Sequence, residues 1–285
     1  MSEAGSTLDP GAAGRCAFRT VLDHDAQVPP TRRGPPDDES IRRRTDAAGR
    51  HRRATALALL ATHGDRALDA GRDVARTLAA LEDRTLVVIV DPALPADHER
   101  RRHGAPSLLV AAPGAGRATW RAVDVHNHFL MTDGTTPLRC ATIEAPMLED
   151  AATRAGRLRK GGAWREDLLR LAHHQRRLES LGVASVERPF VGVVDRGSDL
   201  WWLPLDEALD DRGTALAQYD ARFAERVALL EAIEARNRAP DLDRPGAPWW
   251  HRECETCPHA ERCHGELSAV DDVSLVRFTD ATDQA

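Results

Sequence analysis

Lysine is almost absent from this chain of 285 residues, which has 38 arginines and the single lysine Lys160. Any mechanism that needs a lysine therefore has one candidate. Long hydrophobic runs are missing too. The longest, LALLA (57–61) and LVVIV (86–90), are far shorter than a membrane span or the core of a signal peptide. We therefore expect a soluble, cytoplasmic protein that has no membrane partner.

An excess of positive charge is also lacking. The 39 basic residues are outnumbered by 45 acidic ones, and the formal net charge is -6. Contact with nucleic acid would therefore have to come from a local basic patch. One basic run lies between Arg154 and Arg177, where eight basic residues, Lys160 among them, stand against two acidic ones. Two interpretations stay open: the run contacts phosphates, or it is a solvated helix face.

Cysteine is too scarce and too unevenly placed for a disulfide framework, with residues at positions 16, 140, 254, 257 and 263. Three of them form the pattern C-x2-C-x5-C at Cys254, Cys257 and Cys263. Thiolates at this spacing can bind one metal ion or cluster, and they leave one ligand position open. Metal binding is therefore the favoured interpretation.

Cys16 is the candidate for the fourth ligand, because Cys140 lies in an extended segment. Four thiolates are typical of an iron–sulfur cluster, whereas zinc would also accept a histidine. Spacing alone does not decide between the two metals, and the histidine candidates are His251, His259 and His264. If Cys16 joins the site, it closes a loop of more than two hundred residues. Closing that loop would stabilise the fold by a few kcal/mol, an order-of-magnitude value.

The remaining pattern is typical of one globular α/β domain with a mixed sheet, in a chain that is 42% hydrophobic. Helices are predicted over about 41–62, 66–81 (with Asp65 as its cap), 164–181 and 214–236. Strands are predicted over 85–91, 107–112, 119–129, 189–195 and 199–205, the last four as two hairpins. The predicted segments are an N-terminal segment 1–40, a core 41–245, a cysteine segment 246–267 and an acidic tail 268–285.

The strand predicted over 119–129 carries polar residues at alternate positions. Because side chains alternate between the two faces of a strand, Asp124, His126 and His128 are expected on one face. Val123 and Val125 are then expected on the other face. The strand thus predicts a polar site on one side of the sheet and a hydrophobic core on the other.

A cysteine near the N-terminus, a central segment of this kind and a C-terminal C-x2-C-x5-C resemble the iron–sulfur RecB-type nucleases of the PD-(D/E)XK superfamily. That superfamily includes CRISPR-associated exonucleases and the AddB nuclease domain, and the resemblance spans Cys16 to Cys263. It implies a restriction-endonuclease-like mixed sheet flanked by helices. It also implies that the chain ends are joined by a 4Fe-4S cluster on four cysteines, which are Cys16, Cys254, Cys257 and Cys263.

The resemblance also assigns the active site, with departures from the family pattern. Ser107 stands where the family has its first Asp, Asp124 is the acid of the next strand, and His126 takes the place of the family lysine. His51 fits the upstream helical histidine, so Asp124 and His51 would hold a divalent ion, Mg²⁺ or Mn²⁺. His126 would then act near the attacking water.

Further along, Arg170 and His174 stand where the family has a Gln and a Tyr on a helix, and with Lys160 they are candidates for contact with nucleic acid. The implied function is metal-dependent hydrolysis of DNA with a single-stranded portion, in repair or recombination. A second hypothesis is a degenerate pseudo-nuclease that binds DNA or a partner protein without turnover. A third is a zinc-clasped protein unrelated to nucleic acids.

Overall fold

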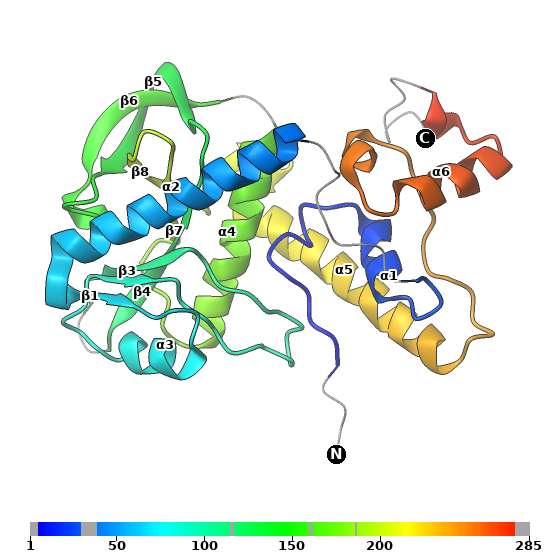
Figure 1. Cartoon of the computed structure of the whole chain (residues 1–285), viewed down its shortest axis with the longest axis horizontal. Helices are drawn as coiled ribbons and strands as arrows, with labels where there is room; N and C mark the ends of the chain where they lie inside the picture. The colour runs from blue at the N-terminus through cyan, green and yellow to red at the C-terminus, as the bar shows by residue number, and fades with distance from the viewer. Residues whose placement is uncertain (1–4, 30–38, 115–116, 160–161, 186, 277–285) are drawn as a thin grey trace. The chain divides into compact units, whose positions relative to one another are not determined.

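The computed structural model describes residues 5–29, 39–114, 117–159, 162–185 and 187–276. The chain divides into two compact units (Figure 1). Unit 1 comprises Met1–Gly14 and Thr45–Ala221, and unit 2 comprises Arg15–Arg44 and Arg222–Ala285. Among the described residues, no helix is both long enough and apolar enough to cross a membrane.

Unit 1 is built on an eight-stranded mixed sheet in the order β1-β2-β3-β4-β7-β8-β5-β6. β1 runs parallel to β2 and β4 runs parallel to β7, whereas the other neighbours are antiparallel. The strands are β1 (Ala67–Asp69), β2 (Val88–Val90), β3 (Leu108–Ala112), β4 (Thr119–Val125), β5 (Met131–Ala141), β6 (Ala152–Leu158), β7 (Phe190–Val194) and β8 (Leu200–Pro204). A separate small sheet pairs β9 (Ala208–Asp210) with β10 (Gly213–Thr214). The predicted α/β class with a mixed sheet is confirmed.

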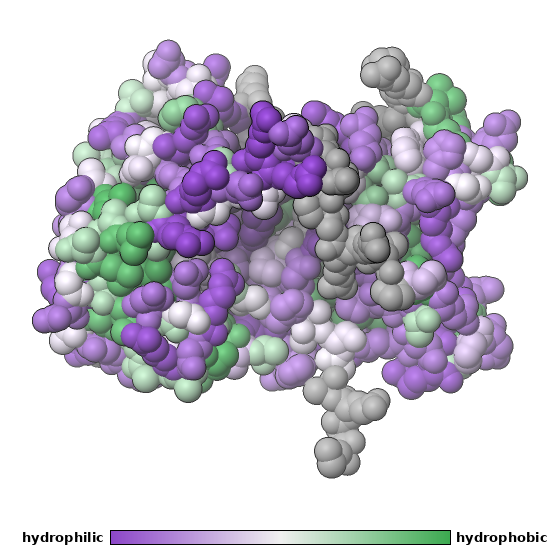
Figure 2. Space-filling model, viewed as in Figure 1, coloured by the Kyte–Doolittle hydropathy of each residue, from purple (hydrophilic) through white to green (hydrophobic). Residues whose placement is uncertain are grey.

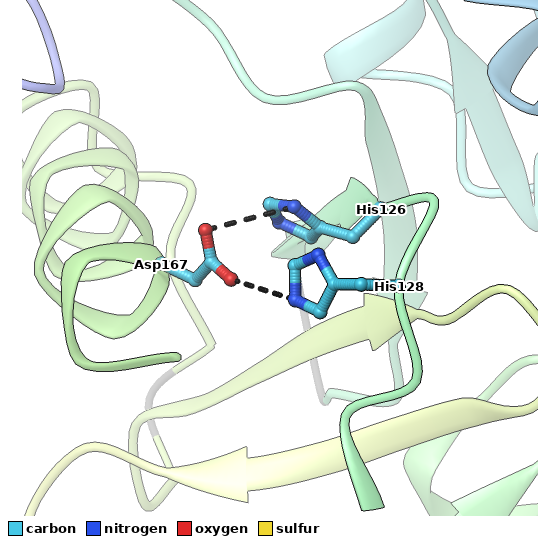
Figure 3. Close-up of side chains that lie close together, drawn as sticks. All are labelled: His126, His128 and Asp167. Atoms are coloured by element: carbon cyan, nitrogen blue, oxygen red, sulfur yellow. Dashed lines mark ion pairs between the residues drawn. The ribbon is translucent and has the colours of Figure 1, made fainter. Parts of the chain in front are cut away.

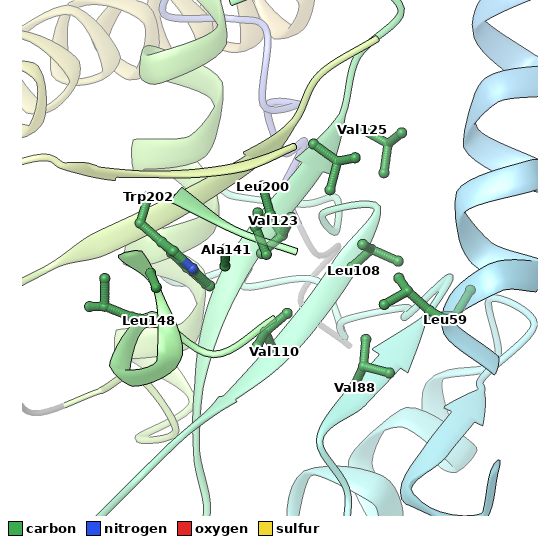
Figure 4. Close-up of a cluster of buried hydrophobic side chains, with 13 residues drawn as sticks. Leu59, Val88, Leu108, Val110, Val123, Val125, Ala141, Leu148, Leu200 and Trp202 are labelled. Atoms are coloured by element: carbon green, nitrogen blue, oxygen red, sulfur yellow. The ribbon is translucent and has the colours of Figure 1, made fainter. Parts of the chain in front are cut away.

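The helices that contribute residues to unit 1 are α2 (Glu39–His63), α3 (Val74–Leu81), α4 (Gly162–Ser180) and α5 (Ala215–Arg238), and 3-10 turns lie at Gly64–Arg66 and Leu148–Asp150. Leu59 of α2 is 2% exposed and packs into an apolar cluster on one face of the sheet (Figure 4). Val123 and Val125 belong to the same cluster. Their neighbour Asp124 points away from it and lies near His174 of α4. α2 and α4 therefore cover opposite faces of the sheet, and the predicted alternation along β4 is confirmed.

Two parts of the predicted element order are wrong. The helix predicted over 66–81 is split into β1 and α3, because Gly71 and Arg72 both adopt positive φ and break the helix. Its predicted cap, Asp65, lies in a 3-10 turn, and Asp73 caps α3 by accepting a hydrogen bond from the Arg76 N–H.

The long β5–β6 pair was not predicted. Most side chains at the start of β5 and along β6 are exposed, so the sequence lacks the apolar alternation that marks a half-buried strand. The two hairpins, β3–β4 and β7–β8, are confirmed.

Unit 2 contains shorter elements and the second half of α5. They are α1 (Ala17–His24), a 3-10 turn at Arg252–Thr256, α6 (Ala260–Ala269) and a 3-10 turn at Val273–Leu275. Polar contacts hold the α1 segment to α5. The Arg236 guanidinium donates to both oxygens of buried Asp25, at 3.0 and 2.9 Å, and Asn237 donates to the His24 carbonyl at 2.8 Å.

Candidate functional site

The candidate site lies in unit 1, where β4 and β7 end side by side. The backbone N–H of His126 donates to the Val194 carbonyl at 2.8 Å, which continues the parallel pairing one residue past β4. Because these strands run parallel, the residues that follow them, from His126 and from Asp195 onward, emerge at the same edge of the sheet. Polar side chains that follow parallel strands are the usual source of sites in α/β folds.

Asp124 and Ser107 are brought together at this edge. Ser107 precedes β3, and both its backbone N–H and its hydroxyl donate to Oδ1 of Asp124, at 2.9 and 3.1 Å. Asp124 is 7% exposed. Burial acts to raise the pKa of Asp124, but nearby His174 and His126, together with the Ser107 N–H, hold it below its usual value. Asp124 is therefore an ionised carboxylate with one oxygen already occupied by Ser107.

His174 lies beside Asp124 on the inner face of α4. Its ring is 1% exposed, and burial lowers its pKa to about 4, although the Asp124 carboxylate acts in the opposite direction. Among the described residues its Nδ1 atom has no hydrogen-bond partner. His174 is thus a neutral, buried imidazole beneath the site and does not present its ring at the surface.

Three side chains, those of His126, His128 and Asp167, converge beyond the end of β4, as Figure 3 shows. Asp167 of α4 reaches toward the turn that follows β4, with its Oδ1 3.6 Å from Nδ1 of His126 and its Oδ2 3.2 Å from Nε2 of His128. One ligand atom from each of the three residues lies within 4.8 Å of the other two. Two imidazoles and one carboxylate at this separation can close around a divalent ion.

The electrostatics of the two histidines differ, and the neutral ring that a metal requires is favoured at His126 and disfavoured at His128. Burial lowers the pKa of His126, although the Asp167 and Asp124 carboxylates raise it, so that ring is neutral near pH 7. Hydrogen bonding to Asp167 raises the pKa of the more exposed His128. Nε2 of His126 is buried and, among the described residues, has no hydrogen-bond partner. A buried ligand atom without a partner is costly unless another group binds it.

Two further predicted residues border the site. Nη1 of Arg170 lies 4.0 Å from Oδ1 of Asp167. The Nε2–H of His51, from α2, donates to the backbone carbonyl of Asp195 at 2.9 Å, so only its Nδ1 could bind an ion. His51 therefore reaches the predicted edge of the sheet, but it does so by holding the chain that follows β7.

The basic run between Arg154 and Arg177 is largely paired within unit 1. Nη1 of Arg177, which is fully buried, donates to the Arg102 carbonyl at 2.8 Å. Three others form ion pairs: Arg154 with Asp199, Arg165 with Asp210, and Arg176 with Asp220. Lys160 lies outside the described residues. These four arginines therefore have partners within unit 1, and phosphate contact by the run stays a prediction.

Asp167 was missed by sequence reasoning. One signal existed, because Asp167, Arg170 and His174 are spaced three and four residues apart on a predicted helix and so share a face. Nothing in the sequence, however, placed that face against residues 126–128.

Unit 2 contains a second candidate site. All four predicted ligands line one pocket, which His251 and His259 also border; the cysteines are Cys16, Cys254, Cys257 and Cys263. The Cys16 N–H donates to Oε2 of Glu253 at 2.8 Å. Burial acts to raise the pKa of the Cys16 thiol, but a hydrogen bond from His251 lowers it overall. Cys140 is buried in β5 of unit 1 and does not line this pocket.

The four cysteines of this pocket are not grouped as closely as the other candidate ligands. Among the described residues, the ligand atoms that lie within 4.8 Å of one another are those of His126, His128 and Asp167. Ligands of a single tetrahedral zinc ion lie close together, since Zn–S bonds of about 2.3 Å place the sulfurs about 3.8 Å apart. A cluster of several iron atoms separates its thiolates further.

Comparison of the chain with protein-family models, with curated proteins and with solved structures finds no match.

Proposed function

We propose that the chain is a nuclease of the restriction-endonuclease-like class that hydrolyses DNA phosphodiester bonds with a divalent ion. More particularly, it is a RecB-like nuclease with an altered metal site, formed by His126, His128 and Asp167. The convergence of these three side chains, with the Asp124 carboxylate acting on the charge of His126, is the observation that carries the proposal. When bound there, the ion would activate a water molecule and neutralise charge on the phosphate.

This assignment changes the metal ligands that the resemblance implies. Asp124 and His51 were expected to hold the ion, but one oxygen of Asp124 is occupied by Ser107 and Nε2 of His51 by a backbone carbonyl. In the proposed site, Asp124 supplies negative charge next to His126. Arg170 stands beside Asp167, where its guanidinium can pair with a bound phosphate.

The ligand set also narrows the choice of ion. Mg²⁺ prefers oxygen ligands and dehydrates reluctantly, whereas imidazole suits softer divalent ions. A site with two imidazoles and one carboxylate therefore favours Mn²⁺ over Mg²⁺. This preference agrees with the replacement of the family's first Asp by Ser107, which removes one oxygen ligand.

A basic surface for DNA is available on α2. Arg50, Arg52 and Arg53 are all exposed and flank His51 on that helix. The exposed side of α2 is strongly hydrophilic in Figure 2. Arginines on one helix next to the site can bind the phosphates of a strand without reading its sequence.

The four-cysteine pocket supports the proposal of a 4Fe-4S cluster in unit 2. Four cysteines line this pocket, with Cys16 in the same lining as Cys254, Cys257 and Cys263, and four thiolates are the usual ligands of such a cluster. The cluster would then hold the α1 segment to the C-terminal cysteine segment. Its role in this proposal is structural.

The test of the metal site is Asp167→Asn, with Glu166→Gln, an exposed neighbour on the same helix, as the matched control. We expect Asp167→Asn to reduce Mn²⁺-dependent cleavage of single-stranded DNA by about 100-fold or more, because the ion loses its only anionic ligand. Mn²⁺ binding, measured by electron paramagnetic resonance, should fall in parallel. Cleavage that persists undiminished in Asp167→Asn would reject the site.

One observation favours the pseudo-nuclease as a second candidate. Ser107 stands where the family has its first Asp. Its N–H and its hydroxyl both donate to Oδ1 of Asp124, which leaves that oxygen less available to a metal ion. If this chain only binds DNA, the wild type will show binding that weakens with salt and no turnover with Mg²⁺, Mn²⁺ or Zn²⁺. The same cleavage assay therefore decides between the two candidates.

A further inference from the structure

An exposed aromatic ring stands directly beside the proposed metal site. Phe129 follows His128 in the chain, and the residue is 45% exposed. Two guanidinium groups lie near its ring, with the Cζ atoms of Arg159 and Arg196 at 5.8 and 5.9 Å from the ring centroid. The tryptophans of the sheet differ in this respect, since Trp120, Trp201 and Trp202 are buried at 6% exposure or less.

The chain around this ring is held in place by hydrogen bonds. The Arg196 N–H donates to the His128 carbonyl at 3.1 Å, which fixes the turn after β7 against the turn after β4. Gly197 lies close to the ring, because a Cβ atom at that position would be 3.4 Å from it. The carboxylate of Asp195 accepts from the N–H groups of Gly197 and Leu130, at 2.8 and 3.4 Å. Phe129 is therefore presented on a supported surface.

An exposed aromatic ring with two nearby guanidinium groups complements a nucleotide. An exposed ring offers a flat apolar face. The guanidinium groups of Arg159 and Arg196 offer positive charge and planar surfaces for stacking. A nucleotide has both complementary parts, a base with a π-face and a phosphate. Stacking of a base on an aromatic side chain contributes about 1–3 kcal/mol and does not depend on which base it is.

We propose that Phe129 is a stacking platform for one base of a single DNA strand, and that Arg159 and Arg196 bind the phosphates on either side of that base. This inference rests on the proposed action on DNA. Since Phe129 adjoins His128, the stacked base belongs to a nucleotide close to the one whose phosphate reaches the metal ligands. A base inside a duplex cannot stack in this way, so the platform selects single-stranded substrate.

The test compares binding of two fluorescein-labelled strands of equal length, an oligothymidylate and its abasic counterpart, by anisotropy in buffer without divalent ions. We expect Phe129→Ala to weaken binding of the oligothymidylate about 5- to 20-fold and to leave binding of the abasic strand nearly unchanged. Phe129→Trp should retain the preference for bases. Leu57→Ala, which removes another exposed apolar side chain, is the matched control and should change neither affinity.

Three results would overturn the platform: unchanged binding by Phe129→Ala, an equal loss of affinity for both strands, or no binding of either strand by the wild type. A melting temperature close to wild type shows that the variant is folded. Base-dependent binding that needs Phe129, in a protein that cleaves nothing with any divalent ion, would reject the proposed hydrolysis but support the platform.

Discussion

The two units of this chain are stabilised by different means. Unit 1 buries a continuous apolar cluster between α2 and the sheet, in which Val88, Val123 and Trp202 are at most 1% exposed. Unit 2 has short helices, a buried Asp25–Arg236 ion pair and a pocket lined by four cysteines. Its buried apolar side chains are fewer; those described are Phe18, Val21, Leu22, Val28, Phe223, Leu230, Ile233 and Leu267. Hydrophobic burial can sustain unit 1, whereas unit 2 has a smaller apolar core and, in the proposal above, also a cluster on its four cysteines.

The largest expected effect comes from removing one sulfur ligand. Cys263→Ser should abolish the visible absorbance and the iron and sulfide content of protein purified without oxygen. It should also destabilise unit 2 by about 5 kcal/mol, because the cluster closes a loop of more than two hundred residues. Hydrogen exchange should then increase in α1 and α6 while β3 and β4 stay protected.

The control for this variant is Cys140→Ser in unit 1, which should retain the iron and the absorbance. Equal iron content in the two variants would contradict the assignment of the cluster. A loss of protection spread evenly over both units would contradict the contrast between them.

A core substitution tests the other side of the comparison. Leu59→Ala removes a side chain that is 2% exposed in the apolar cluster, and should lower the free energy of unfolding of unit 1 by about 3 kcal/mol. Leu57→Ala, two residues away on α2 and 61% exposed, should cost less than about 0.5 kcal/mol. Urea unfolding followed by circular dichroism measures both. Similar costs for the two variants would show that α2 does not pack as described.

The smallest effect is a pH dependence confined to unit 1. His173 is fully buried, and burial holds its pKa well below the ordinary value. Its Nε2–H donates to the His103 carbonyl at 2.9 Å, and its Nδ1 accepts from the Tyr219 hydroxyl at 2.9 Å. Nδ1 can accept only in the neutral ring, so the unfolded chain takes up a proton first as the pH falls below about 6.5.

Stability that depends on neutral His173 is therefore complete above pH 7 and is lost progressively toward acid. Between pH 7 and pH 5 this loss should be about 1–2 kcal/mol. In His173→Gln, whose amide can make both hydrogen bonds without titrating, the urea midpoint should fall by correspondingly less over this range. An identical pH profile in the wild type and the variant would exclude His173 as the cause.

Local patterns in the sequence predicted much of the fold. The apolar period along α2, α4 and α5 predicted three helices, and the turn residues between apolar runs predicted both hairpins. The alternation along β4 placed Asp124 on the polar side, opposite Val123 and Val125. β5 and β6 were missed because their side chains are largely exposed, and no face of either strand had to be apolar.

The candidate metal site could be predicted only in part. His126 and His128 were expected on the Asp124 face of a strand over 119–129, but β4 ends at Val125 and both histidines lie in the turn after it, where strand alternation no longer determines their direction. Asp167 reaches them only because α4 packs across β4, and packing between elements far apart in sequence is not encoded in any local pattern. The pairing of Arg154, Arg165 and Arg176 with distant acids was hidden for the same reason.

Asp195 ties together segments that the chain order keeps far apart. Its carbonyl accepts from His51, 144 positions earlier, and its carboxylate accepts from the N–H of Leu130, 65 positions earlier. A single residue thus anchors α2, with its exposed arginines, to the turn that bears Phe129. If the arginines of α2 bind DNA as proposed, this residue links the bound strand to the segment that holds His126 and His128.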